Sequence, residues 1–278
     1  MEGGCTGVSC LGTAGNSMMR EKVTAIIPTF NNEKIIRRCL ENVKWADEIL
    51  IADSYSTDRT LEICREFTDK IIQHEYINSA FQKNWAIPQA THDWIFLLDT
   101  DEYLEEGLLE EILDALENPE PGIDGYVFRR KNLIYNKWVG TCGYYPDYLV
   151  RLFKKKYRYY TREVHAHIDI PPERTRQFKH HLIHDDFNDI HSYLIKFARY
   201  MKYECDEYWK QGRRFKWKEI TLRPLYVFLH SYILKRGYRD GVRGFLISTN
   251  LAYYNFMIFM KLWEREFYEK QKNQTHAK

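Results

Sequence analysis

Short apolar runs alternate with helically spaced apolar residues over the first hundred positions. Residues 23–28 form a β-branched run closed by proline, and residues 32–43 place apolar side chains at helical spacing. The pattern then repeats, with strands expected over 47–52, 70–74 and 94–98 and helices over 59–67 and 80–90. Strands and helices that alternate in this way predict an α/β fold with a mostly parallel, doubly wound central sheet.

The rest of the chain changes character near residue 188. A helix is expected over 106–118 and strands over 125–130 and 148–153, whereas the pattern from residue 190 onward is helical. Residues 190–278 carry 18 Lys and Arg against 8 Asp and Glu, while residues 1–189 carry 23 against 31. We therefore expect a disordered extension or tag over 1–18, the α/β domain over 19–188, and a helical, basic and aromatic C-terminal region over 189–278.

Two acids follow the apolar run at 94–98. Asp99 and Asp101 are spaced i and i+2, and charges beside a core are tolerated when a cation or hydrogen-bond donors compensate them. Such oxygen ligands suit Mg²⁺ or Mn²⁺, and Mg²⁺ commonly combines one or two carboxylates with substrate phosphates. The alternative is a strand end that precedes an acidic helix N-terminus, with Glu102, Glu105 and Glu106 in the first turn.

The sheet topology predicts where the ligand binds. In doubly wound sheets, ligands lie at the carboxyl ends of the strands. Residues 28–33, 53–58 and 99–101 all follow predicted strands, so we expect them to converge on one crevice.

Composition and cysteine use limit the class of protein. The six cysteines are scattered without a CxxC pair, which is typical of a reduced intracellular protein. No run of 18 apolar residues indicates a membrane span, and residues 1–18 lack the pattern of a signal peptide. We expect a cytoplasmic protein located at the inner face of the cell membrane.

Several motifs, in order, resemble those of family 2 glycosyltransferases. They lie at residues 25–33, 52–58, 82–84 and 98–102. Further motifs are similar to the branch that contains lipopolysaccharide core β-1,4-glucosyltransferases; they lie at 143–147, 151–153, 164–165, 223–224 and 231–234. The resemblance spans about residues 22–265 and implies the Rossmann-like GT-A fold for the domain at 19–188.

The resemblance also implies roles for individual residues. Asp53 would accept from the nucleotide base, Asp99 would contact the ribose region, and Asp101 would bind the metal that bridges the diphosphate. The remaining residues expected to bind the nucleotide sugar are Pro28, Glu33, Lys83, Asn84 and Arg151. The alternatives are a capping role for Asp53, a helix-turn acid for Glu33, and a solvated helix face for Lys83 and Asn84.

Asp147 is the candidate catalytic base, because it follows a Gly-aromatic-aromatic-Pro turn and matches the acceptor-side acid of the family. It could instead stabilise the turn. Arg151 would pair with the diphosphate or with Asp147, or would be an exposed strand residue. His165 would complete the metal shell, with His184 as the weaker alternative. The branch has an acid after this histidine, whereas this chain has Ala166, which puts the acceptor contact in doubt.

Residues 223–234 and 244–263 are apolar and aromatic, and cations lie between them. Such segments can lie in a membrane interface or form an ordinary helical cap. The resemblance thus implies an inverting transferase that uses Mg²⁺ or Mn²⁺ to move a hexose, expected to be glucose, from a UDP-sugar to a glycolipid or cell-envelope saccharide. The alternatives are a peptide or protein glycosyltransferase and a nucleic-acid-binding protein, although no nucleic-acid motif is present, so no nucleic-acid partner is expected.

Overall fold

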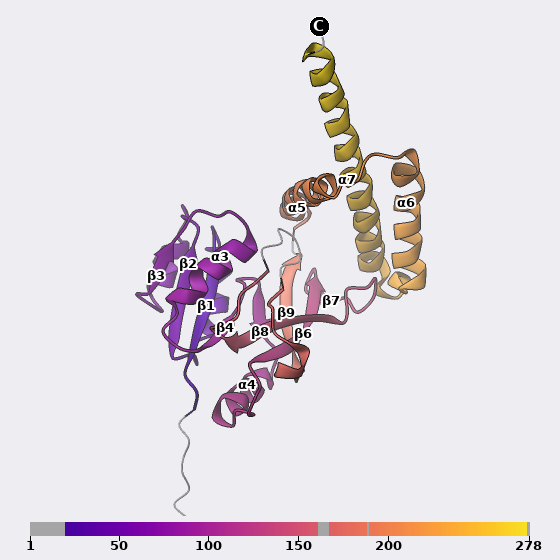
Figure 1. Cartoon of the computed structure of the whole chain (residues 1–278). Helices are drawn as coiled ribbons and strands as arrows, with labels where there is room; N and C mark the ends of the chain where they lie inside the picture. The colour runs from indigo at the N-terminus through magenta and orange to yellow at the C-terminus, as the bar shows by residue number, and fades with distance from the viewer. Residues whose placement is uncertain (1–19, 161–166, 188, 277–278) are drawn as a thin grey trace, which may run out of the picture.

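The protein is described here by a computed structural model covering residues 20–160, 167–187 and 189–276. A single sheet runs through its centre, and the strand order over these residues is β3-β2-β1-β4-β8-β6-β9-β5, with β7 paired to β6. Helices flank the sheet and form a separate C-terminal layer (Figure 1). The extension predicted at 1–18 lies outside the described residues.

The first four strands pair in parallel, as the alternating pattern predicts. They are β1 (Val23–Thr29), β2 (Glu48–Asp53), β3 (Ile71–Gln73) and β4 (Trp94–Leu97). The connecting helices are α1 (Ile36–Glu41), α2 (Thr60–Cys64) and α3 (Ser79–Ala86), the last continued by η1 (Ile87–Gln89). The α/β fold with a helical C-terminal region is confirmed, although α1 and α2 are shorter than their apolar spacing indicates.

The second half of the sheet is mixed. Strand β8 (Asp147–Lys154) pairs antiparallel with β4 and with β6 (Gly125–Ile134), which also carries the short β7 (Lys137–Trp138). Strand β9 (Thr175–Phe187) follows η2 (Pro172–Arg174) and lies between β6 and β5 (Glu102–Leu104). Sequence patterns missed β9, because its histidines and charged residues hide the alternation of a strand. Pairing on both sides holds it in place.

Apolar side chains cover both faces of the parallel strands. Ala25 and Ile27 of β1 belong to the cluster that contains α1 and α4 (Leu108–Glu117), while Ile26 belongs to the cluster beneath α3 and η1. This two-sided burial explains why the strands are continuous apolar runs, since strands buried on both faces need no polar alternation.

The C-terminal layer consists of α5 (Ile190–Lys210), α6 (Trp217–Leu229), η3 (His230–Leu234), η4 (Gly237–Asp240) and α7 (Gly241–His276). Helix α6 packs along α7 on the side away from the sheet (Figure 1). Ile247 of α7 is anchored on the sheet domain against Ile134, Val139 and Cys142. None of the helices in the described part of the chain is long and apolar enough to cross a membrane.

The junction of η4 and α7 depends on a close backbone approach at Gly244. A Cβ at this position would lie 1.8 Å from the carbonyl oxygen of Gly237. Alanine normally stabilises a helix interior by about 0.5–1 kcal/mol relative to glycine.

We expect the opposite sign for Gly244→Ala, a loss of about 2 kcal/mol, because the backbone must move apart. Urea unfolding measures this change in the free energy of unfolding. Thr249→Ala, at an exposed position of the same helix, is the control. A Gly244→Ala protein as stable as the wild type would contradict the described packing.

Candidate active site

Asp99 lies two residues after the end of β4, where two cations bind it. Its carboxylate lies 3.1 Å from Nζ of Lys83 on α3, and Nη2 of Arg151 on β8 donates to it at 2.5 Å. Burial raises the pKa of Asp99, but Arg151 and Lys83 outweigh this effect and hold the pKa below its ordinary value. Burial lowers the pKa of Lys83, and Asp99 offsets only part of that change. Asp99 is therefore an anion held between two buried cations.

Glu102 is the second buried acid of the site. The backbone turns tightly after Asp99, so that Glu102 N donates to Asp99 O and its own carboxylate accepts from Asp99 N at 3.2 Å. The fully buried side chain accepts from Arg151 at 2.6 Å and from Arg130 at 3.0 Å. Sequence reasoning took Glu102 for a possible helix-turn acid and did not identify Arg130. The available signal was a third acid after the Asp99 and Asp101 pair, with arginines on two predicted strands.

Asp147, the predicted base, begins β8 beside these residues. Its Oδ2 accepts from Nε of Arg130 at 2.8 Å and from Nδ2 of Asn132 at 3.2 Å. No hydrogen bond from the described part of the chain reaches Oδ1, and the side chain is 32% exposed. Two of the alternatives for Arg151, a pair with Asp147 and an exposed position on the strand, are wrong: Arg130 pairs with Asp147, and Arg151 is buried against Asp99 and Glu102. Its contact with the diphosphate stays a prediction.

Asp101 is connected to Asp147 through two polar side chains. Nδ1 of His184 lies 2.7 Å from Oδ1 of Asn132, and Nε2 of His184 lies 3.5 Å from the Asp101 carboxylate. Because Asn132 donates through its amide nitrogen, its oxygen faces His184, so Nδ1 carries the proton in this arrangement. In the neutral imidazole, Nε2 is then an acceptor that faces a carboxylate. Such a pair of acceptors suits a shared cation.

The loops that follow β1 and β2 are hydrogen-bonded to each other. Asn31 N donates to Ser56 Oγ at 2.9 Å, and Arg59 N donates to the Glu33 carboxylate at 3.1 Å. Asp53 is fully buried and accepts from Ser56 and from Gln73, so it anchors its own loop. Its predicted contact with a nucleotide base stays a prediction.

The loop after β4 is connected to the end of β2 through α3. Gln82 donates to Ala52 O at the end of β2, and the adjacent Lys83 contacts Asp99 beyond β4. Pro28 pairs with Ala52 in the intervening ladder. The carboxyl ends of β1, β2 and β4 therefore share one edge, on which β2 and β4 lie about 10 Å apart across β1.

Asn84 has a structural contact in the described residues. Its side chain donates to Tyr159 O and accepts from Tyr159 N, both at 2.8 Å, which clamps Tyr159 onto α3. Burial raises the pKa of Tyr159 to about 12, so its phenol stays protonated. The Tyr159 hydroxyl and Nε of Arg151 are both buried at this edge, and neither has a hydrogen-bond partner of good geometry among residues 20–160, 167–187 and 189–276.

The sequence that forms this site matches a known protein family. The family model described as Glycosyl transferase family 2 matches residues 24–183, more than half of the chain. The chain belongs to glycosyl transferase family 2. The family predicted from the ordered motifs is confirmed, and the protein is a glycosyltransferase.

Two relatives of this glycosyltransferase match it over more than nine-tenths of its length. The lipopolysaccharide core biosynthesis glycosyltransferase LpsC of Rhizobium meliloti (strain 1021) is 26% identical over 273 residues, which cover 92% of this chain and 97% of the relative. An uncharacterised glycosyltransferase of Rickettsia conorii is also 26% identical, over 93% of this chain and 95% of that one. Among solved structures, S. aureus TarS 1-349 matches with a TM-score of 0.37 and 20% identity, over 48% of this chain and 47% of that chain. That likeness is too partial to add to the assignment.

The residues of the glycosyltransferase site fit a divalent cation that is bound together with a diphosphate. Within residues 20–160, 167–187 and 189–276, no three His, Cys, Asp or Glu side chains gather in a metal-binding cluster. Asp101 and His184 do offer two adjacent donors, and Mg²⁺ usually completes such a set with phosphate oxygens and water. His165 lies outside the described residues, so its predicted role stays a prediction.

Charge balance supports the same conclusion. Three cations of the described residues, Lys83, Arg130 and Arg151, contact three acids, Asp99, Glu102 and Asp147. A diphosphate bound here would therefore meet cations that are already paired. A divalent cation would add positive charge beside it.

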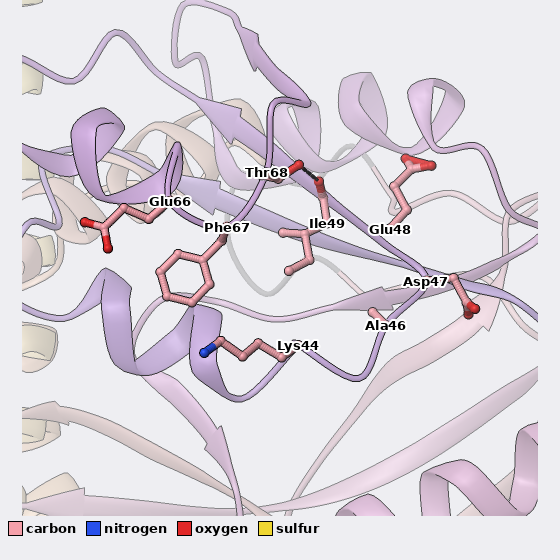
Figure 2. A pocket seen from close by; sticks show the side chains of 8 residues that line it. All are labelled: Lys44, Ala46, Asp47, Glu48, Ile49, Glu66, Phe67 and Thr68. Carbon is pink, nitrogen blue, oxygen red and sulfur yellow. Dashed lines mark hydrogen bonds between the residues drawn. The ribbon is translucent and has the colours of Figure 1, made fainter.

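A separate hollow lies at the opposite edge of the sheet. It has a volume of about 450 Å³, and Figure 2 shows its lining around the start of β2, where Thr68 donates to Ile49 O. Its lining residues are Lys44, Ala46, Asp47, Glu48, Ile49, Glu66, Phe67 and Thr68. Because β2 ends at Asp53, this hollow is remote from the charged residues of the site.

The burial of Glu102 yields a stability prediction. We expect Glu102→Gln to lower the free energy of unfolding by about 3 kcal/mol, because buried Arg151 and partly buried Arg130 lose part of their compensation. The matched control is Glu120→Gln, which breaks an exposed pair with Arg176 and should cost less than about 1 kcal/mol. Urea unfolding compares the two variants, and equal losses would show that Glu102 is not a buried ion-pair partner.

Proposed function

We propose that this glycosyltransferase moves a hexose, expected to be glucose, from a UDP-sugar to a hydroxyl of a glycolipid or cell-envelope saccharide, with inversion and with a divalent metal. The observation that carries the proposal is the continuous set of contacts that connects Asp101, through His184 and Asn132, to the open carboxylate of Asp147. Family membership supplies the reaction class. The relative named for lipopolysaccharide core biosynthesis supports a cell-envelope acceptor.

The donor would lie along the carboxyl edge of the parallel strands. The loops that contain Pro28, Glu33 and Asp53 would surround the uridine, and Asp99 would meet the ribose. Lys83 and Arg151 would lie beside the diphosphate. Desolvation lowers the pKa of Arg151, but the Asp99 and Glu102 carboxylates outweigh this effect and hold the pKa well above its ordinary value, so Arg151 stays charged. The metal held by Asp101 and His184 would supply positive charge to the departing diphosphate.

Asp147 would act on the acceptor. As the acceptor oxygen forms its bond to the anomeric carbon, the bond from that carbon to the diphosphate oxygen breaks, and the acceptor proton passes to Oδ1 of Asp147. Arg130 and Asn132 hold Oδ2 and so orient the carboxylate. A base on the face opposite the leaving group gives inversion.

The donor and metal requirement can be tested together. A panel of nucleotide sugars is incubated with the full chain, with Mn²⁺, with Mg²⁺ or with EDTA, and hydrolysis or transfer is recorded. We expect a UDP-hexose to be consumed only with metal, and Asp101→Ala to abolish turnover because a metal ligand is lost. Asp69→Ala, at an exposed acid outside the site, is the control. Equal turnover in EDTA would overturn the metal-dependent mechanism.

The base assignment predicts a different kinetic pattern. Asp147→Asn should lower kcat by about 10²- to 10⁴-fold, because the amide cannot take the proton, while UDP affinity stays near the wild-type value. Calorimetry with UDP and metal gives the affinity, and initial rates give kcat. A parallel loss of both would place Asp147 in donor binding instead.

We also propose that the enzyme works at the inner face of the cell membrane, where it would meet a lipid-linked acceptor. The basic and aromatic composition of the C-terminal helices supports this placement.

A further inference from the structure

Helix α6 exposes its apolar side. Its outward residues and their continuation in η3 are spaced as one helical stripe and are 41% to 66% exposed: Leu222, Leu225, Tyr226, Leu229 and Ile233. Figure 1 shows α6 at the rim of the molecule, beyond α7. A helix at the surface of a soluble protein normally turns such a stripe toward the core.

The inward side of the same segment makes both polar and apolar contacts. Arg223 donates to Asn255 of α7 at 3.0 Å and lies over the ring of Phe259, while Ser231 is buried and accepts from Ser248 at 3.0 Å. Ile220 packs against the cluster that contains Phe259, so α6 is apolar on its outward side as well as toward α7. Since monomeric proteins rarely expose large contiguous apolar patches, this stripe indicates a contact surface.

The exposed stripe continues onto the following turns. These residues are exposed by half or more and include two aromatic rings: Leu234, Tyr238, Val242 and Phe245. Together with the stripe on α6 and η3 they form what we call the α6 outer face. Trp217 adds a third ring at the start of α6, where it is 72% exposed.

Unpaired cations border this face at both ends. Lys216 and Lys218 lie at the start of α6, and a second group follows η3: Lys235, Arg236 and Arg239. All five are exposed, and no ion pair links them to any residue of the described ranges. The only acids between positions 216 and 245 are engaged elsewhere: Glu219 with Arg223, and Asp240 with Thr141.

We propose that the α6 outer face lies on an anionic lipid bilayer, with the helix axis parallel to the membrane surface. Leucines and aromatic rings would enter the headgroup boundary, and the bordering cations would bind lipid phosphates. Helix α6 is about 20 Å long, which suits an interfacial helix and not a span. This deepens the proposed function, because it identifies the surface through which the enzyme would meet a lipid-linked acceptor.

The charges around the α6 outer face argue against a second copy of the chain as the partner that covers it. A two-fold dimer through this face would bring two sets of five cations together without acids to compensate them. An anionic bilayer meets both the apolar stripe and its basic border.

The test uses the full chain and vesicles of phosphatidylcholine, alone or mixed with phosphatidylglycerol, in a cosedimentation assay. We expect binding to the anionic vesicles. The triple variant Lys235→Gln, Arg236→Gln, Arg239→Gln should weaken that binding about 100-fold. A second triple, Leu222→Gln, Leu225→Gln, Leu229→Gln, should weaken it at least about tenfold.

A matched control removes three exposed cations from other surfaces: Lys22→Gln, Arg65→Gln and Lys179→Gln. It should bind far more tightly than the first triple, and all variants should bind UDP as the wild type does. The proposal is overturned if the wild type ignores anionic vesicles or if the control loses as much binding as the Lys235 triple. It is also overturned if light scattering shows a lipid-free dimer that the leucine triple dissolves. Vesicle binding without UDP binding would instead contradict the proposed UDP-sugar donor alone.

Discussion

The neutralisation of Glu102 by two arginines is the interaction on which the site depends. A carboxylate without solvent exposure is stable only with cationic and hydrogen-bonding partners, because an isolated buried charge costs far more than folding can supply. Arg151 serves both Glu102 and Asp99, so it fixes the turn after β4 to the middle of β8. Arg130 extends the same pairing from Glu102 to Asp147.

This pairing has a chemical consequence. Because the arginines already neutralise the buried acids, little free positive charge is left for a diphosphate. In the proposed mechanism, Asp101 and His184 would hold a metal ion that supplies this charge. Arg130 and Asn132 hold Asp147 by one oxygen, and the other oxygen is the one proposed to take the acceptor proton.

The C-terminal layer differs from the site in that it leaves apolar side chains exposed. Arg223 of α6 and Ser231 of η3 make polar contacts with α7, and Ile220 packs on the apolar cluster there, while the leucines of α6 stay exposed. This packing leaves apolar side chains exposed to water, which is unfavourable. The arrangement becomes favourable when a second apolar phase is present, and the bordering cations select an anionic one.

The sequence by itself determined the alternation of strands and helices, the parallel pairing of β1 to β4 and the family, and it predicted Asp99, Asp101 and Asp147 as site residues. These follow from local spacing and from short motifs, which act over a few residues. Only the tertiary structure decided which charged side chains form pairs and which strands lie side by side. Glu102 and Arg130 are 28 positions apart, and β9 becomes a strand because neighbours on both sides pair with it. Which charges meet, and which face of α6 is left uncovered, depend on long-range packing that no local pattern encodes.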